Sequence, residues 1–414
     1  MTQNHHLRLI KAENTQSLHQ QLALLGVSAS GCYHMVPKGQ FFLLYVDDLS
    51  NPAVLILKQE MLSLGAEAAI HHQVIVNGID KSAVLLMATL AQYHKLIEKL
   101  QTQGFGLSQL ADEIVELLSR IQCAPKAIVC HNRDREFVLD FRKNTLLMGI
   151  ANLTPDSFYD GGKYNEPNQA IDHIFALAEA GADIIDIGGA SSRPGFSCVE
   201  PQEEIDRILP VVEAVAPLLS VPISIDSDKA QVMDLALAAG AMIVNDIGGL
   251  QKDPEMAKVA VKYNAPVIIM HDTAVADANP VNLKKNQGYD MVDCVLDFFR
   301  NSIEVARKAG VEAERLIVDP GIGFGKTLEE NLLLLRRLPE LAVLGHPVLV
   351  GTSNKSFIGK LLGLPIEARS YGTAASVALA IAGGAQIVRV HGIDVMLQAA
   401  VIADAILGRH DHYE

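Results

Sequence analysis

Residues 146–153 read LLMGIANL and residues 184–189 read IIDIGG, and each is a short apolar run that ends in polar residues or glycine. Near-continuous apolar strands are required where both faces of a sheet are covered. Six further runs of this kind follow, separated by amphipathic segments of helix length. The eight runs are residues 146–153, 184–189, 222–226, 242–247, 266–271, 316–321, 347–353 and 387–391.

Eight strands alternating with helices over roughly 265 residues match the size of a (β/α)8 barrel. An open doubly wound sheet is the alternative, but it normally has fewer strands and a glycine-rich dinucleotide turn after the first one, which is absent here. We therefore predict an α/β fold with a (β/α)8 TIM barrel, whose active site lies at the C-terminal ends of its strands.

The first part of the chain predicts a small α/β unit. Residues 41–46 and 82–87 have strand length, and residues 52–64, 90–100 and 107–121 have helical spacing. None of these segments carries a convergent set of catalytic residue types. The predicted domains are 1–122 as a small α/β N-terminal domain of unknown role, 123–143 as a connection, and 144–414 as the catalytic barrel.

Composition limits the partners. The net charge is −14, from 48 acidic and 34 basic residues, which argues against a nucleic-acid partner held by a broad basic face. No run reaches the roughly 18 apolar residues of a membrane helix, so we expect no membrane partner. The polar first residues lack a signal-peptide core, and the five scattered cysteines suggest no disulfide framework. We expect a cytoplasmic protein.

Polar side chains end all eight predicted strands. Any one of them could simply cap the next helix. Capping does not account for Lys355, Arg389 and His391, because cations do not cap helix N-termini. The strand-end residues are Asn152, Asp186, Asp226, Asn245, His271, Asp319, Ser353 with Lys355, and Arg389 with His391.

These groups indicate a specific chemistry. Acceptors and an amide, from Asp226, Asn245 and Asp319, suit the donor and acceptor edge of a flat nitrogen heterocycle. Positive charge from Lys355, Arg389 and His391 suits a phosphate or another oxyanion. Asn152 offers a neutral oxygen for Mg²⁺, which usually binds through few protein oxygens plus substrate phosphates. The combination suggests displacement of pyrophosphate.

Two long connections follow the first two strands. Residues 154–162 read TPDSFYDGG and residues 188–195 read GGASSRPG. Both combine glycines with charged or aromatic tips, as mobile active-site lids do. Plain exposed loops are the simpler interpretation, but an Asp and an Arg within glycine-rich turns at the catalytic face favour a functional role.

The barrel resembles the dihydropteroate synthases. The resemblance starts with Met148-Gly-Ile-Ala-Asn-Leu-Thr-Pro-Asp-Ser-Phe158 and Asp160-Gly-Gly162, and it continues in order over nearly the whole barrel. The N-terminal unit is similar to the extension of longer family members. The other matching blocks are residues 188–195, 224–226, 245–246, 319–325, 351–357 and 389–391.

The resemblance implies a pterin-binding type of TIM barrel and a transferase of folate biosynthesis. It would condense 6-hydroxymethyl-7,8-dihydropterin diphosphate with para-aminobenzoate, giving 7,8-dihydropteroate and pyrophosphate. Mg²⁺ is the implied cofactor. The expected partners are these small-molecule substrates and a second copy of the chain in a homodimer.

Matched position by position, the resemblance implies a role for each site residue. The pterin would be held by Asp226, Asn245, Asp319 and Lys355, and the diphosphate with Mg²⁺ by Asn152, Arg389 and His391. Asp156, Phe158 and Arg193 would close over the site, and Ser356 with Lys355 would meet the aminobenzoate carboxylate. Ser192 and Phe324 complete the implied substrate-binding set. The implied catalytic residues are Asp156, Arg193, Lys355, Arg389 and His391.

The chain departs from the family pattern at six positions. The family usually has Glu at Ala190, Thr at Ser192, Tyr or a similar residue at Asp228, Ser at Gly248, Arg at Asn354 and Asp at Gly392. Two alternatives to a working synthase therefore stay open. One is a synthase-like paralogue that joins the pterin to a different amine. The other is a pterin-binding or methyl-transfer protein, which would have no pyrophosphate to hold.

Overall fold

The computed structural model describes residues 7–10, 12, 15–153, 166–190, 199–283 and 288–409. It divides into two compact units, residues 1–119 and 120–414, which are considered separately below. In the described part of the chain, no helix has the length and apolar character needed to cross a membrane.

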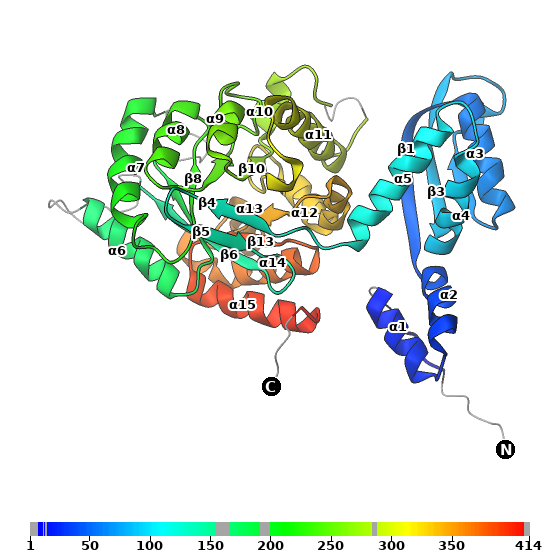
Figure 1. The fold of residues 1–414 in the computed structure, drawn as a ribbon, viewed down its shortest axis with the longest axis horizontal. Helices are drawn as coiled ribbons and strands as arrows, with labels where there is room; N and C mark the ends of the chain where they lie inside the picture. The colour runs from blue at the N-terminus through cyan, green and yellow to red at the C-terminus, as the bar shows by residue number, and fades with distance from the viewer. Residues whose placement is uncertain are drawn as a thin grey trace. The chain divides into compact units, whose positions relative to one another are not determined.

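The first unit contains a three-stranded antiparallel sheet in the order β1-β3-β2 (Figure 1). The strands are β1 (Phe41–Ser50), β2 (Glu67–Ile70) and β3 (Lys81–Thr89), with a short helix η1 (His72–Val74). The helices are α1 (Thr15–Leu24), α2 (Ala29–Gly39), α3 (Asn51–Ser63), α4 (Leu90–Leu100) and α5 (Leu107–Gln122), the last of which runs across the division between the units. The two predicted strands and three predicted helices are all present.

The second unit is the predicted barrel. Eight parallel strands run in the order β11-β10-β9-β8-β7-β6-β13-β12, and a parallel bridge between Val318 and Val348 joins the two ends of this order. The strands are β6 (Leu146–Asn152), β7 (Ile184–Gly188), β8 (Ile223–Asp226), β9 (Ile243–Asp246), β10 (Val267–Met270), β11 (Leu316–Asp319), β12 (Leu349–Val350) and β13 (Ile387–Val390).

Helices connect successive strands and cover the outside of the barrel. They are α6 (Glu166–Glu179), α7 (Pro201–Val215), α8 (Ala230–Ala238), α9 (Met256–Tyr263), α10 (Thr273–Ala278), α11 (Met291–Ala309), α12 (Leu328–Arg336), α13 (Ser356–Leu362), α14 (Ser370–Ala382) and α15 (Ile393–Ile406). Short 3-10 helices are η4 (Ala313–Arg315), η5 (Leu338–Leu344) and η6 (Ile366–Ala368). Outward side chains such as Ile185, Val244 and Val388 pack against these helices in one large core.

A hairpin covers the N-terminal end of the barrel. Strands β4 (Ile128–His131) and β5 (Glu136–Leu139) pair antiparallel within residues 123–143, the stretch expected as a connection. Side chains of the hairpin form one cluster with residues at the starts of the barrel strands, such as Ile184 and Ile387. Because this end is filled, the polar strand ends at the opposite side of the barrel are where a ligand has access.

Candidate active site

The predicted polar residues lie together at the C-terminal ends of the barrel strands. Asn152 ends β6, Asp226 ends β8 and Asp319 ends β11. Asn245 lies in β9 opposite Asp226, and Arg389 lies in β13. This arrangement follows from the parallel sheet, since all eight strands point their C-terminal ends to one side.

Arg389 joins two buried carboxylates. Its Nε donates to Oδ2 of Asp186 at 2.6 Å, and its Nη2 donates to Oδ2 of Asp226 at 2.6 Å. Nδ2 of Asn245 lies 3.2 Å from each oxygen of Asp186. The Asp186 side chain is fully buried, and the Arg389 side chain is 15% exposed. A single guanidinium therefore offsets part of the cost of burying two acids.

Opposing influences act on the pKa of the Asp226 carboxyl. Burial raises the pKa of its carboxyl, the charge of Arg389 lowers it, and the nearby Asp186 and Glu204 raise it again. Burial would lower the pKa of Arg389, but Asp186 and Asp226 outweigh this and raise it, so the guanidinium stays charged.

Asn152 lies close to this cluster. A Cβ placed on Gly188 would lie 3.5 Å from Oδ1 of Asn152 and 3.5 Å from Cβ of Asp226. The missing side chain at Gly188 thus leaves open space between the amide and the carboxylate. Within the described residues, no group of three or more His, Cys, Asp or Glu side chains is placed to hold a metal ion.

His391 pairs with a hydroxyl. Oγ of Ser353 lies 2.9 Å from Nδ1 of His391, and the backbone N–H of His391 donates to the same Oγ at 3.3 Å. This contact fixes the ring plane at the end of β13, while the proton positions depend on the tautomer.

The turn after β11 presents Asp319. Oδ1 of this buried carboxylate accepts the N–H of Gly321 at 2.8 Å. Gly321 has a left-handed φ of +63°, and a Cβ there would lie 2.0 Å from the carbonyl oxygen of His271. Only glycine fits this position.

Lys326 holds the same turn to the end of β10. Its Nζ donates to the carbonyl oxygens of His271, Gly321 and Phe324 at 3.0, 2.9 and 3.2 Å. Three acceptors match the three donors of an ammonium group. Burial lowers the pKa of Lys326 to about 7, although Asp272 and Asp319 act to raise it.

Lys355 lies over the ring of Phe324, with its Nζ 4.0 Å from the ring centroid. Its charge also acts on Asp319 and Asp226, lowering the pKa of each against the effect of burial. The positive charge of Lys355 therefore favours the ionised form of both carboxyls. Ser356 begins α13 directly after it and is exposed.

The structure gathers most of the predicted set, but not all of it is described. Asp156, Phe158, Ser192 and Arg193 lie outside the described residues, as do most of both long connections. Three residues have contacts that the sequence argument did not assign: Asp186, Ser353 and Lys326. The signal for Asp186 was a charged residue inside an otherwise apolar strand, IIDIG.

The structure describes the surroundings of four positions at which the chain departs from the family pattern. Asp228 pairs with Lys252, and a Cβ on Gly248 would lie 2.8 Å from Cβ of Lys252. Asn354 has a left-handed φ of +56°, a conformation that asparagine tolerates better than most residues. Gly392 precedes α15 and is exposed.

Known proteins are similar to this chain in sequence and in fold. A family model described as "Pterin binding enzyme" matches residues 148–391. The dihydropteroate synthase of Bacillus subtilis is 44% identical over 271 residues, covering 66% of this chain and 92% of that protein. The solved structure of Xanthomonas albilineans dihydropteroate synthase with 4-aminobenzoic acid has a TM-score of 0.62 and 37% identity, covering 68% of this chain and 99% of that one.

One longer relative also matches part of the N-terminal unit. A probable bifunctional folylpolyglutamate synthase/dihydropteroate synthase of Halobacterium salinarum is 45% identical over 354 residues, covering 84% of this chain and 41% of that protein. A match of this length exceeds the second unit and must extend into the first.

The family model that matches residues 148–391 places this barrel among the pterin-binding enzymes. Within that class, the chain belongs to the dihydropteroate synthase family, whose members are transferases.

Proposed function

We propose that this chain condenses 6-hydroxymethyl-7,8-dihydropterin diphosphate with para-aminobenzoate and releases pyrophosphate. The observation that carries the proposal is the buried cluster of Asp226, Asp186 and Asn245 around Arg389, facing Asp319 and Lys355. Acceptors for a heterocycle and cations for a leaving anion thus occur in one site.

Asp226 and Asp319 would accept N–H groups of the pterin ring. Carboxylates are acceptors on both oxygens, which suits the adjacent donors of an aminopyrimidine edge. Because Nδ2 of Asn245 donates to Asp186, its amide is oriented with Oδ1 as the remaining acceptor. Lys355 would supply a donor and positive charge beside the ring.

The reaction forms a C–N bond as a C–O bond breaks. The amine lone pair attacks the methylene carbon of the pterin, the electron pair of the C–O bond leaves with pyrophosphate, and the nitrogen then loses a proton to solvent. A neutral aniline nitrogen needs no strong base. Arg389, His391 and Lys355 would therefore contribute mainly by stabilising the departing anion.

Mg²⁺ fits the residues present. Asn152 supplies one neutral oxygen at the strand ends, and a cation with few protein ligands takes its other oxygens from substrate phosphate and water. When bound, the ion would neutralise part of the diphosphate charge. Asp156, Phe158, Ser192 and Arg193 are proposed to cover the substrates, and Ser356 to meet the aminobenzoate carboxylate.

We also propose that the protein is cytoplasmic. The cysteines among the described residues, Cys32, Cys123, Cys130 and Cys294, are free thiols, as expected in a reducing compartment.

We further propose that the protein is a homodimer. Apolar side chains on α14 and α15 are exposed, with Leu379 at 70%, Ile402 at 59% and Ile406 at 79%. An exposed apolar group of this kind is typical of a subunit interface. Light scattering should give twice the chain mass, and Ile402→Glu should shift it towards the monomer.

The test of the activity is pyrophosphate release in the presence of pterin diphosphate, Mg²⁺ and para-aminobenzoate. We expect release that requires all three, with dihydropteroate as the organic product. Pterin binding without pyrophosphate release would instead favour a pterin-binding or methyl-transfer protein. Release that depends on an amine other than para-aminobenzoate would favour the paralogue.

A further inference from the structure

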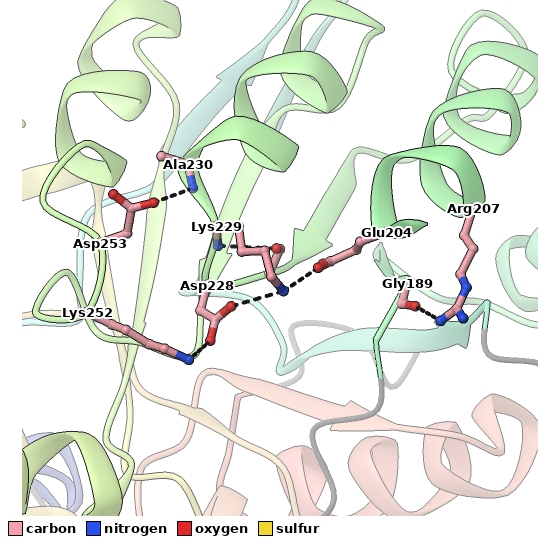
Figure 2. Close-up of polar contacts among 9 residues, drawn as sticks. Gly189, Glu204, Arg207, Asp228, Lys229, Ala230, Lys252 and Asp253 are labelled. Atoms are coloured by element: carbon pink, nitrogen blue, oxygen red, sulfur yellow. Dashed lines mark hydrogen bonds and ion pairs between the residues drawn. The ribbon is translucent and has the colours of Figure 1, made fainter. Parts of the chain in front are cut away.

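Helix α7 carries two charged side chains that reach the ends of two barrel strands. Glu204 and Arg207 are three positions apart and so lie on one face of the helix. Nη1 of Arg207 donates to the carbonyl oxygen of Gly189, just after β7, at 2.7 Å. Oε2 of Glu204 lies 2.6 Å from Nζ of Lys229, just after β8 (Figure 2).

The Glu204 carboxylate is deeply buried. Its side chain is 1% exposed, and its second oxygen, Oε1, has no hydrogen-bond partner among the described residues. A buried carboxylate of this kind needs a cation beside it. Burial would lower the pKa of Lys229, but Glu204 and Asp228 outweigh it and raise that pKa, so the ion pair persists.

Gly189 brings the backbone into contact with this acid. A Cβ on Gly189 would lie 2.9 Å from Cγ of Glu204 and 2.9 Å from Cγ1 of Ile208. The end of β7 therefore packs directly on the stem of Glu204, and the end of β8 is held by its carboxylate.

The ion pair continues towards β9. Asp228 lies 3.5 Å from Nζ of Lys229 and also pairs with Lys252, giving the alternating series Glu204, Lys229, Asp228 and Lys252 (Figure 2). Asp253 accepts the N–H of Ala230 at 2.9 Å and so caps the start of α8. Ion pairs of Asp228 and Lys229 therefore hold the connection that follows Asp226, together with hydrogen bonds of Ser227 to Asn245 and Lys229.

Glu204 also acts on Asp226 through its charge. The charged groups that act on Asp226 are Arg389 from β13, Asp186 from β7, Glu204 from α7 and Lys355 after β12. Of these, Glu204 belongs to a helix outside the ring of strands. Its negative charge raises the pKa of the Asp226 carboxyl.

We propose that Glu204 is a positioning residue for the pterin site: its buried carboxylate holds Lys229 and so fixes the connection that follows Asp226. This inference rests on the proposed function, because it takes Asp226 to bind the pterin as an ionised acceptor.

The test is the pH dependence of binding of 6-hydroxymethylpterin to the full chain, measured by calorimetry. Binding should weaken at low pH as Asp226 becomes protonated. We call the pH range over which binding weakens the acid limb. In Glu204→Gln the acid limb should move to lower pH by about half a unit to one unit, because a nearby negative charge is lost. The affinity above the limb should weaken about threefold to tenfold, because the grip on Lys229 is weaker.

Glu203→Gln is the matched control. It removes the same charge from the same helix, but the Glu203 side chain is 58% exposed and pairs with Arg207, so the acid limb should stay in place. Lys229→Gln is the second variant. It leaves the Glu204 charge without a cation, and its limb should move to higher pH.

Opposite shifts of the acid limb in Glu204→Gln and Lys229→Gln would separate an effect of charge from a general loosening of the site. An acid limb that coincides with the parent in whichever variant folds, as judged by circular dichroism, overturns the inference while the parent still binds the pterin. A parent that binds no pterin contradicts both this inference and the proposed function.

Discussion

On one side of the candidate site, the side chain of Arg389 holds Asp186 and Asp226, and Asn245 donates to Asp186, whereas on the other side Asp319 depends on the backbone of the turn at 320–326. We call these the ionic side and the turn side. The ionic side brings together charged side chains from three different strands, β7, β8 and β13. The turn side uses glycine, three carbonyls and Lys326 to hold one peptide loop.

The difference indicates how each side responds to change. An ion cluster transmits a change of charge to every member, since each pKa depends on the others. A glycine turn transmits a change of shape, because its backbone has no room to move. Substitutions on the ionic side should therefore change the pH dependence of pterin binding, whereas substitutions on the turn side should change mainly the stability of the fold.

The largest effect should come from Arg389→Met on the ionic side. It leaves Asp186 and Asp226 buried without a cation, which typically costs about 3–5 kcal/mol. We expect weaker binding of both bare pterin and its diphosphate, and a lower melting temperature. Arg389→Lys keeps the positive charge but lacks the two-pronged guanidinium. Its pterin affinity and melting temperature should lie between those of the parent and of Arg389→Met. Loss of diphosphate binding alone, with bare pterin affinity unchanged, would show that Arg389 serves only the leaving group.

Gly321→Ala should be the largest change on the turn side. The new Cβ would lie 2.0 Å from the carbonyl oxygen of His271, so the turn must shift, at a cost on the order of 2 kcal/mol. Gly363→Ala is the control, because Gly363 has a similar φ of +66° with nothing within 4 Å of the added Cβ. Urea unfolding should show a clearly larger loss for Gly321→Ala. Equal losses would mean that left-handed strain, rather than contact, governs the turn.

Asp186→Asn tests the ionic side through pH. Asp186 raises the pKa of Asp226, so removing its charge should move the acid limb of pterin binding to lower pH. The sign follows because Asp226 must be ionised to accept ring donors, and a lower pKa keeps it ionised further into acid. We expect a shift of about one unit. A limb that moves to higher pH would contradict this arrangement of charges.

Thr273→Val should have the smallest effect. Oγ1 of Thr273 donates to the carbonyl oxygen of Phe324 at 3.2 Å, and its loss should cost about 0.5–1.5 kcal/mol of stability. Because no charge changes, the acid limb of pterin binding should stay where it is in the parent. A shifted limb would mean that the two sides are coupled more closely than their contacts suggest.

Sequence periodicity predicted the barrel well, because buried parallel strands are short and continuously apolar. The run at 184–189, for example, corresponds to β7 (Ile184–Gly188). It did not predict β2 or the hairpin of β4 and β5, because these short strands each include a polar or charged residue and lie outside the repeated alternation of strand and helix. Helix α1 was not predicted either, and the structure buries none of its residues.

The strand-end positions of Asp226, Asn245, Asp319 and Arg389 were predictable, since a parallel barrel brings these ends together. Their partners were not. Arg389 was expected to face an anionic ligand, yet it bonds two acids of its own chain, and nothing in a linear pattern shows which charges neutralise one another. Lys326 follows a glycine-rich turn, but its three carbonyl acceptors depend on the folded path of the backbone.

The hairpin beneath the barrel has a consequence for synthesis on the ribosome. Its apolar residues, such as Ile128 and Leu139, emerge before every strand that they later contact, and Ile387 is made more than two hundred residues afterwards. The nascent chain therefore carries an apolar segment that is not fully covered until translation is nearly complete, a state in which chaperones are commonly required. Any excised barrel would need to begin before Ile128 to keep its floor.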